Sequence, residues 1–142
     1  MPQATKHIRV LVAEDEESVR ALLERVLQRH DYEARVVARG DAAIGALQED
    51  PSIALLLSDV MMPGADGLSL AAWVRRHRPE LPVVLMSALA QTTDLIDGYA
   101  AGAQYYVTKP LREARLIQVL DYVSGRSDEA PPHEIEGRGE TF

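Results

Sequence analysis

Short apolar stretches recur along the chain, and the two longest show no alternation with polar residues. Residues 7–13 (HIRVLVA) and 53–58 (IALLLS) are nearly continuous runs of aliphatic side chains. Such runs are typical of strands that are buried on both faces of a parallel sheet. Together with three shorter stretches, they predict strands at residues 7–13, 33–38, 53–58, 82–86 and 105–107.

Between these stretches, apolar residues recur at the three- and four-residue spacing of an amphipathic helix. Residues 16–30, for example, place Leu23 and Leu27 on one helical face. Pro79 and Gly102 follow two of the helical stretches, and both residue types commonly end a helix. The predicted helices cover residues 16–30, 42–48, 68–77, 92–101 and 112–123.

Strand and helix therefore alternate five times, which indicates an α/β protein with a parallel sheet covered by helices on both faces. We expect a flavodoxin-like (βα)5 fold with a five-stranded parallel sheet in the order 2-1-3-4-5. A chain of 142 residues is long enough for one domain with a hydrophobic core and too short for two ordinary ones. We place this domain at residues 1–124.

Residues 125–142 differ in composition, with two consecutive prolines and no hydrophobic periodicity. A segment of this kind buries too little apolar surface to fold alone, so we predict a flexible C-terminal tail or linker. Residues 135–138 (IEGR) match the site cut by the protease factor Xa, either by chance or as the remnant of an engineered fusion. The tail is therefore left out of the fold prediction.

Composition narrows the classes of function. A formal net charge of −7 is typical of proteins that bind cations or basic partners rather than nucleic acid. The absence of cysteine excludes disulfides, thiolate catalysis and cysteine-ligated metal sites. The N-terminus lacks the apolar core of a signal peptide, and no apolar run reaches membrane-spanning length. We expect a cytoplasmic protein that neither binds nucleic acid directly nor spans a membrane.

Polar residues stand where four of the predicted strands end. Glu14 and Asp15 follow the first strand, Asp59 the third, Ser87 the fourth and Lys109 the fifth. In the order 2-1-3-4-5 these strand ends are neighbours at the switch point, where open parallel sheets bind their ligands. Three carboxylates, a hydroxyl and an ammonium group are therefore expected to converge in one pocket.

Such a pocket has a definite chemistry. Converging carboxylates repel one another, and a hard divalent cation such as Mg²⁺ relieves this repulsion. A lysine adds a point charge that suits a phosphate oxygen. These groups predict a phosphoryl-transfer site in which one carboxylate is the nucleophile and forms an acyl phosphate. A lone Asp59 would be interpreted as an ordinary turn residue, but the polar residues at the matching strand ends favour a functional role.

Four motifs, in this order and at these strand ends, resemble the receiver domain of two-component response regulators. The resemblance extends over roughly residues 6–124, which is nearly all of the predicted domain. The matching motifs are AEDE (residues 13–16), SDVMMPGADG (58–67), MSA (86–88) and YVTKP (106–110).

The resemblance implies a role for each site residue. Asp59 would be the phosphoacceptor, and Lys109 would pair with a phosphoryl oxygen. Mg²⁺ or Mn²⁺ would be held by the carboxylates of Glu14, Asp15 and Asp59 and by the backbone carbonyl of Met61.

It also implies a switch and an access route. Ser87 would hydrogen-bond the phosphoryl group and move when it arrives, and Tyr106 would turn inward as Ser87 moves. Ala88 is small and would leave the phosphoryl group accessible, and the peptide bond between Lys109 and Pro110 would be cis.

The implied function is that of a signalling switch that promotes its own phosphorylation and dephosphorylation, rather than an enzyme with a separate substrate. A sensor histidine kinase or a histidine phosphotransfer protein would donate the phosphoryl group. The face formed by the fourth helix, fifth strand and fifth helix would then control a downstream protein target or an output domain. It would also allow a homodimer, although Gln104 and Tyr105 stand where many DNA-binding members carry two acids. Tyr105 is also a second candidate for the switch, but the spacing to Lys109 favours Tyr106.

Three alternatives belong to other classes. A pseudo-receiver would share the fold and act as a phosphorylation-independent interaction module, but such proteins usually lack an acid or the lysine that this chain retains. A phosphatase of the haloacid dehalogenase type needs a second aspartate where Met61 stands. A flavodoxin needs a hydroxyl- and glycine-rich phosphate loop after the first strand, where residues 14–17 (EDEE) are acidic.

Overall fold

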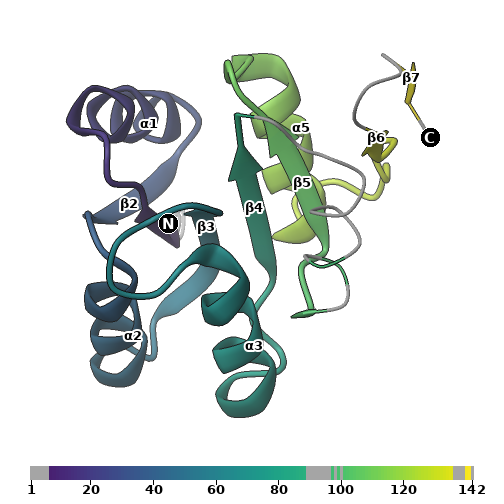
Figure 1. Ribbon diagram of the computed structural model, residues 1–142. Helices are drawn as coiled ribbons and strands as arrows, with labels where there is room; N and C mark the ends of the chain where they lie inside the picture. Colours follow the sequence, from purple (N-terminus) through teal and green to yellow (C-terminus); the bar gives the residue numbers. More distant parts are fainter. Residues whose placement is uncertain (1–6, 89–96, 98, 100, 136–139, 142) are drawn as a thin grey trace, which may run out of the picture.

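A five-stranded parallel sheet forms the centre of the molecule (Figure 1). The computed structural model describes residues 7–88, 97, 99, 101–135 and 140–141. The strands pair in the order β2-β1-β3-β4-β5, as predicted. They are β1 (Ile8–Ala13), β2 (Tyr32–Val37), β3 (Ile53–Asp59), β4 (Val83–Ser87) and β5 (Tyr105–Thr108).

Helices cover both faces of this sheet. One face carries α2 (Gly40–Glu49) and α3 (Gly67–His77), and the other carries α1 (Glu17–Arg29) and α5 (Glu113–Val123) (Figure 1). The helix predicted at residues 92–101 lies mostly outside the described residues. Two short strands near the C-terminus, β6 (Glu134–Ile135) and β7 (Glu140–Thr141), form a separate antiparallel pair. Among the described residues, no helix has the length and apolar character needed to cross a bilayer.

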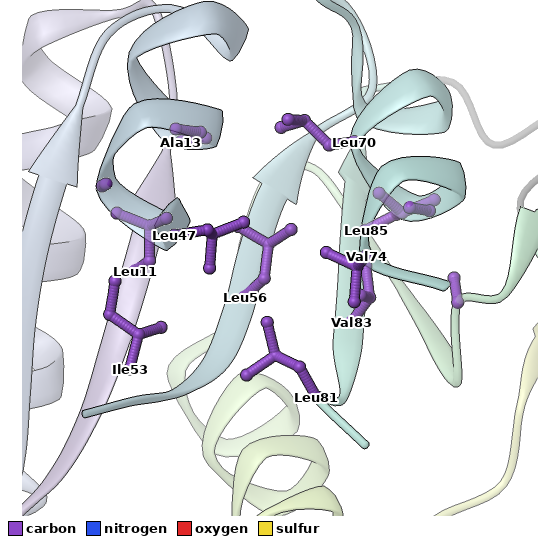
Figure 2. Close-up of a cluster of buried hydrophobic side chains, with 14 of the residues drawn as sticks. Leu11, Ala13, Leu47, Ile53, Leu56, Leu70, Val74, Leu81, Val83 and Leu85 are labelled. Atoms are coloured by element: carbon purple, nitrogen blue, oxygen red, sulfur yellow. The ribbon is translucent and has the colours of Figure 1, made fainter. Parts of the chain in front are cut away.

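Strands β1, β3 and β4 are mainly apolar because both of their faces are buried, whereas the edge strand β2 carries Glu33 and Arg35 and is mostly half-buried. Along β3, Leu56 packs with the side chains of α2 and α3, whereas Leu55 and Leu57 pack with those of α1 and α5. Figure 2 shows the first of these clusters, with Leu47 of α2 and Leu70 of α3 on either side of Leu56. The predicted α/β fold class is therefore confirmed, and its two-sided core fixes how the strand ends are arranged.

Three strands extend one residue beyond their predicted ends, and β5 does so by including Thr108. β3 includes Asp59 and β4 includes Ser87, and both residues are buried. In the register of the sheet, Ala13 pairs with Ser58, Asp59 with Met86, and Ser87 with Thr108. The sequence placed these polar residues at the carboxyl ends of their strands, and the ladder includes both, so they are held at fixed positions at its carboxyl edge.

β2 begins at Tyr32, one residue before the prediction, because this side chain is buried and its hydroxyl donates to the Asp121 carboxylate at 2.7 Å. Burial is the main cause that raises the pKa of Tyr32 to about 12. The folded protein therefore holds this proton more tightly than the unfolded chain, where a phenol titrates near pH ~10. The stabilisation is complete below pH ~10 and is lost as the pH rises toward the folded pKa.

We therefore expect the free energy of unfolding to fall as the pH rises above about 10, and to fall less steeply in Tyr32→Phe. Urea unfolding curves recorded at intervals from pH 8 to roughly pH 12 would measure both slopes. Equal slopes in the two proteins would contradict this prediction.

Candidate functional site

Lys109 joins two carboxylates at the carboxyl edge of the sheet. Its ammonium nitrogen donates to Glu14 Oε1 at 2.6 Å and to Asp59 Oδ2 at 2.9 Å. Glu14 directly follows β1 and is completely buried, and Asp59 ends β3 with 8% of its surface exposed. Since β1 and β3 are neighbours in the sheet, the two acids face one cation that comes from beyond β5.

Asp15 completes a group of three acids. One carboxylate oxygen from each of Glu14, Asp15 and Asp59 lies within 4.8 Å of the other two, and Asp15 is exposed while the others are buried. Backbone amides hold two of the carboxylates, because Glu14 Oε2 accepts from Glu16 N at 2.9 Å and Asp59 Oδ1 accepts from Met61 N at 3.3 Å. The group is therefore anchored on its inner side and open to solvent at Asp15.

Burial and charge act in opposite directions on this group. Burial raises the pKa of Glu14, and the hydrogen bond from Lys109 offsets only part of that rise. Burial alone would lower the pKa of Lys109, but its hydrogen bonds to Glu14 and Asp59 outweigh that effect and raise the pKa. Lys109 therefore stays protonated, and the buried carboxylate of Glu14 would be stabilised in its charged form by an additional cation.

Ser87 ends β4, the strand between those that carry Asp59 and Lys109. It is buried, with 7% of its surface exposed, and its carbonyl accepts the Lys109 amide at 2.8 Å. The next residue, Ala88, is exposed. The peptide bond between Lys109 and Pro110 is cis.

The two adjacent tyrosines of β5 lie on opposite faces of the sheet. Tyr106 is completely buried in the cluster beneath α2 and α3, where its ring meets the Tyr99 ring edge-on at 6.0 Å. Tyr105 belongs to the cluster on the opposite face and meets Tyr122 of α5 edge-on at 5.9 Å. Of the two, Tyr106 therefore shares a core cluster with the loop that follows Asp59, through Val60.

The loop between β3 and α3 is fixed to its surroundings by backbone contacts. Val60 N donates to Met86 O at 2.9 Å, and Gly67 N donates back to Val60 O at 2.8 Å. Met61, two residues after Asp59, is a large apolar residue that is not buried, because 75% of its surface is exposed. The loop thus brings the backbone of Met61 to the acidic group and leaves its side chain in solvent.

One contributor was missed by the sequence analysis. Arg20 of α1 donates from Nη1 to the backbone carbonyl of Glu14 at 2.9 Å, which ties the start of α1 to the site. An arginine on a solvent-facing helix carries no sequence signal for such a contact. Only the packing of α1 beside the end of β1 could have identified it.

The sheet order and the three acids and one lysine at its carboxyl edge define an α/β domain of the flavodoxin-like class. The response regulator receiver domain family matches residues 10–121, and the chain belongs to this family.

Individual relatives agree with this assignment. The transcriptional regulatory protein TcrA of Mycobacterium tuberculosis is 37% identical over 129 residues, which are 91% of this chain and 51% of TcrA. The chain thus spans about half the length of that relative. The receiver domain of the Francisella response regulator 1452 superposes with a TM-score of 0.79 at 28% identity, over 84% of this chain and 98% of that one.

A more distant structure shows the same fold. The receiver domain of the sensor histidine kinase PA1611 from Pseudomonas aeruginosa has a TM-score of 0.77 at 24% identity, over 84% of this chain and 99% of that one. That domain has a magnesium ion coordinated in its active site cleft.

Proposed function

We propose that this receiver domain is a phosphorylation-controlled switch whose phosphoacceptor is Asp59. The donor is a phosphohistidine on a sensor histidine kinase or a histidine phosphotransfer protein. The observation that carries the proposal is the position of Lys109 Nζ, at 2.9 Å from Asp59 and 2.6 Å from Glu14. A cation beside a nucleophilic carboxylate can neutralise the negative charge on the oxygens of a phosphoryl group that is being transferred.

In the proposed reaction, a carboxylate oxygen of Asp59 attacks the phosphorus in line with the bond to the donor imidazole. The new O–P bond forms as the P–N bond breaks, and the electron pair of the P–N bond returns to the imidazole nitrogen. Lys109 already touches the carboxylate, so it can hydrogen-bond an oxygen of the attached phosphoryl group. Ala88 is small and exposed, and it would leave the approach to Asp59 open.

The acidic group fits a hard divalent cation. Its three carboxylate oxygens lie within 4.8 Å of one another, and Mg²⁺ prefers a few carboxylates completed by water. Glu14, Asp15 and Asp59 would hold Mg²⁺ or Mn²⁺, and the Met61 backbone carbonyl would be a further ligand. When bound, the ion would neutralise negative charge on the phosphoryl oxygens.

Phosphorylation would then be transmitted to the face that includes β5 and α5. Ser87 would move toward the phosphoryl group and Tyr106 would follow, which shifts an existing equilibrium between two states. The recipient would be a downstream protein target or an output domain, and a homodimer through this face is the other arrangement that we consider. This activity belongs in the cytoplasm and involves no direct contact of this chain with nucleic acid.

The metal site is tested by Glu14→Gln. We expect this variant to bind Mg²⁺ about tenfold or more weakly than the wild type, because it removes one negative charge from a buried ligand. Isothermal titration calorimetry would measure the affinity. Glu17→Gln, an exposed acid in the first turn of α1, is the matched control and should bind as the wild type does. Equal affinity in all three proteins would place the ion elsewhere.

The proposal as a whole is tested by intact mass after incubation with Mg²⁺ and acetyl phosphate or phosphoramidate. We expect the wild-type chain to gain one phosphoryl group. If the chain gains none from these donors or from a phosphohistidine protein, the phosphorylation-independent pseudo-receiver becomes the better description.

A further inference from the structure

Residues 131–133, which we call the strap, lie against β5 and α5 through specific hydrogen bonds. The Tyr105 hydroxyl donates to the carbonyl of Pro131 at 2.7 Å, and Arg115 Nη1 of α5 donates to the carbonyl of Pro132 at 2.7 Å. The Tyr99 hydroxyl and His133 Nδ1 are 3.0 Å apart. Each residue of the strap therefore contacts a different side chain of the domain.

Ring contacts and burial strengthen this attachment. The His133 imidazole stacks on the Tyr105 ring with centroids 4.1 Å apart and planes at 10°, and it meets Tyr99 edge-on at 5.4 Å. Pro131 is buried, and so is the guanidinium-bearing Arg115 beneath it. Aromatic contacts of this kind stabilise an association beyond the area that they bury.

The segment before the strap is also anchored. Arg126 donates to the carbonyls of His30 and Asp31, each at 2.6 Å, and stacks on Tyr32 at 3.9 Å. The chain therefore leaves α5 along a fixed path before it reaches the strap. Only a few residues separate the two anchors, so the strap returns to β5 at a small cost in chain entropy.

The strap occupies the edge of the sheet. Among the described strands, β5 pairs only with β4, and Figure 1 shows β6, which directly follows the strap, beside β5 and α5. An uncovered edge strand is a site where another chain can bind. A partner that used this face would have to displace the strap from Tyr105 and Arg115 first.

Two contacts connect the strap to the interior. Tyr99 touches His133 on one side and meets the ring of Tyr106 on the other, at 6.0 Å. Tyr106 lies on the same strand that leads to Lys109, the cation at Asp59. A change in the position of Tyr106 or Tyr99 would therefore alter the surface on which His133 rests.

We propose that the strap is an intramolecular cover for the β5–α5 face, and that phosphorylation of Asp59 detaches it so that a partner can bind there. The coupling half of this inference rests on the proposed function. Linkage makes the effect reciprocal: if the phosphorylated site weakens the strap, then loss of the strap favours the form that accepts the phosphoryl group.

The protonation of His133 provides an independent control over the attachment. The rings of Tyr105 and Tyr99 shield part of the otherwise exposed His133 imidazole from water, and this desolvation and, to a lesser extent, the charge of Arg115 lower the pKa of His133 in the attached state. The groups around it are Tyr105, Tyr99 and Arg115, with Glu80 and Asp128 lining the same pocket. The contribution of His133 to the attachment is therefore full above the pKa of a free histidine, near pH ~6.5, and is lost as the pH falls below it.

The attachment itself is measured by NMR on the 142-residue chain. Stacking on Tyr105 should displace the His133 ring-proton signals from their positions in the urea-unfolded chain, and His133→Ala assigns those signals. Addition of Mg²⁺ and beryllium trifluoride, a phosphoryl mimic, should return them toward the unfolded positions. The ¹⁹F signal of bound beryllium trifluoride, and its loss in Asp59→Asn, reports separately whether the site is filled.

The outcomes separate the two proposals. Signals at unfolded positions from the start would overturn the strap. Displaced signals that do not change while beryllium trifluoride is bound would overturn the coupling alone. If no beryllium trifluoride binds, the proposed function fails and the coupling with it, while displaced signals would still establish the cover.

A rate measurement provides the second test. His133→Ala should be phosphorylated by acetyl phosphate about three- to tenfold faster than the wild type, because it loses one ring stack and one hydrogen bond of the attached state. Glu129 is exposed and lies two residues before the strap, so Glu129→Ala should be phosphorylated at the wild-type rate. Equal rates in all three proteins would show that the strap does not restrain the switch.

Discussion

The Asp59→Asn variant is expected to take up no phosphoryl group under conditions in which the wild-type chain takes up one. An amide is a far weaker nucleophile than a carboxylate, while its size and shape are nearly the same. Asp59 is also the one carboxylate that accepts from both the Lys109 ammonium and the Met61 amide among the described residues. Intact mass after treatment with Mg²⁺ and acetyl phosphate measures the result directly.

The matched control is Asp66→Asn, seven residues further along the same loop. Asp66 caps α3, because its side chain accepts from Ser69 N at 2.8 Å, and asparagine caps helices about as well. This variant should therefore fold normally and gain one phosphoryl group. A phosphoryl gain in Asp59→Asn equal to that of the control would refute Asp59 as the acceptor.

The largest effect on stability is expected from Gly40→Ala, at the start of α2. A Cβ atom at this position would lie 1.7 Å from the backbone oxygen of Ala65, and Gly40 N donates to Pro63 O at 3.0 Å. The helix and the loop after β3 therefore approach too closely for any side chain. Because the obstacle is backbone, we expect a loss of about 3 kcal/mol in the free energy of unfolding. Urea unfolding would measure it.

Gly45→Ala in the same helix is the control. A Cβ atom there has no neighbour within 4 Å, and alanine is favoured over glycine inside a helix by about 1 kcal/mol. This variant should therefore be slightly more stable than the wild type. If both alanine variants changed stability in the same direction, the close approach of α2 to the loop would not be the cause.

The Gly40 contact also bears on function. The loop that Gly40 supports includes Met61, whose amide holds Asp59. If Gly40→Ala displaces this loop, Asp59 should also be phosphorylated more slowly than in the wild type. Gly45→Ala should leave the phosphorylation rate unchanged, which separates this effect from a general change in the helix.

The order and type of the five strands of the main sheet and of helices α1, α2, α3 and α5 could be predicted because their signals are local, whereas the short strands β6 and β7 lie in the segment predicted as a tail. A strand buried on both faces is apolar at nearly every position, and residues 53–57 (IALLL) show this without reference to any other part of the chain. The residue types of the candidate site could also be predicted, because parallel strands end at the same edge and Glu14, Asp59 and Lys109 each follow such a run.

Only the tertiary structure shows which groups that are far apart in the sequence come into contact. Lys109 is 95 residues from Glu14 and 50 from Asp59, and only the packed sheet shows that its ammonium group donates to both. Arg20 is only six residues from Glu14, yet its contact with the Glu14 carbonyl also depends on how α1 packs against the end of β1. No spacing in the sequence encodes either distance.

The C-terminal segment shows most clearly the difference between what the sequence predicts and what depends on tertiary packing. Its composition predicted a flexible tail at residues 125–142, because it has no apolar periodicity. The contacts of Pro131 and Pro132 use backbone carbonyls, which every residue possesses and which leave no pattern in a sequence. The sequence determined which residues have hydrophobic or ionisable side chains, and the tertiary structure determined which donors the backbone meets, because that depends on where distant segments pack.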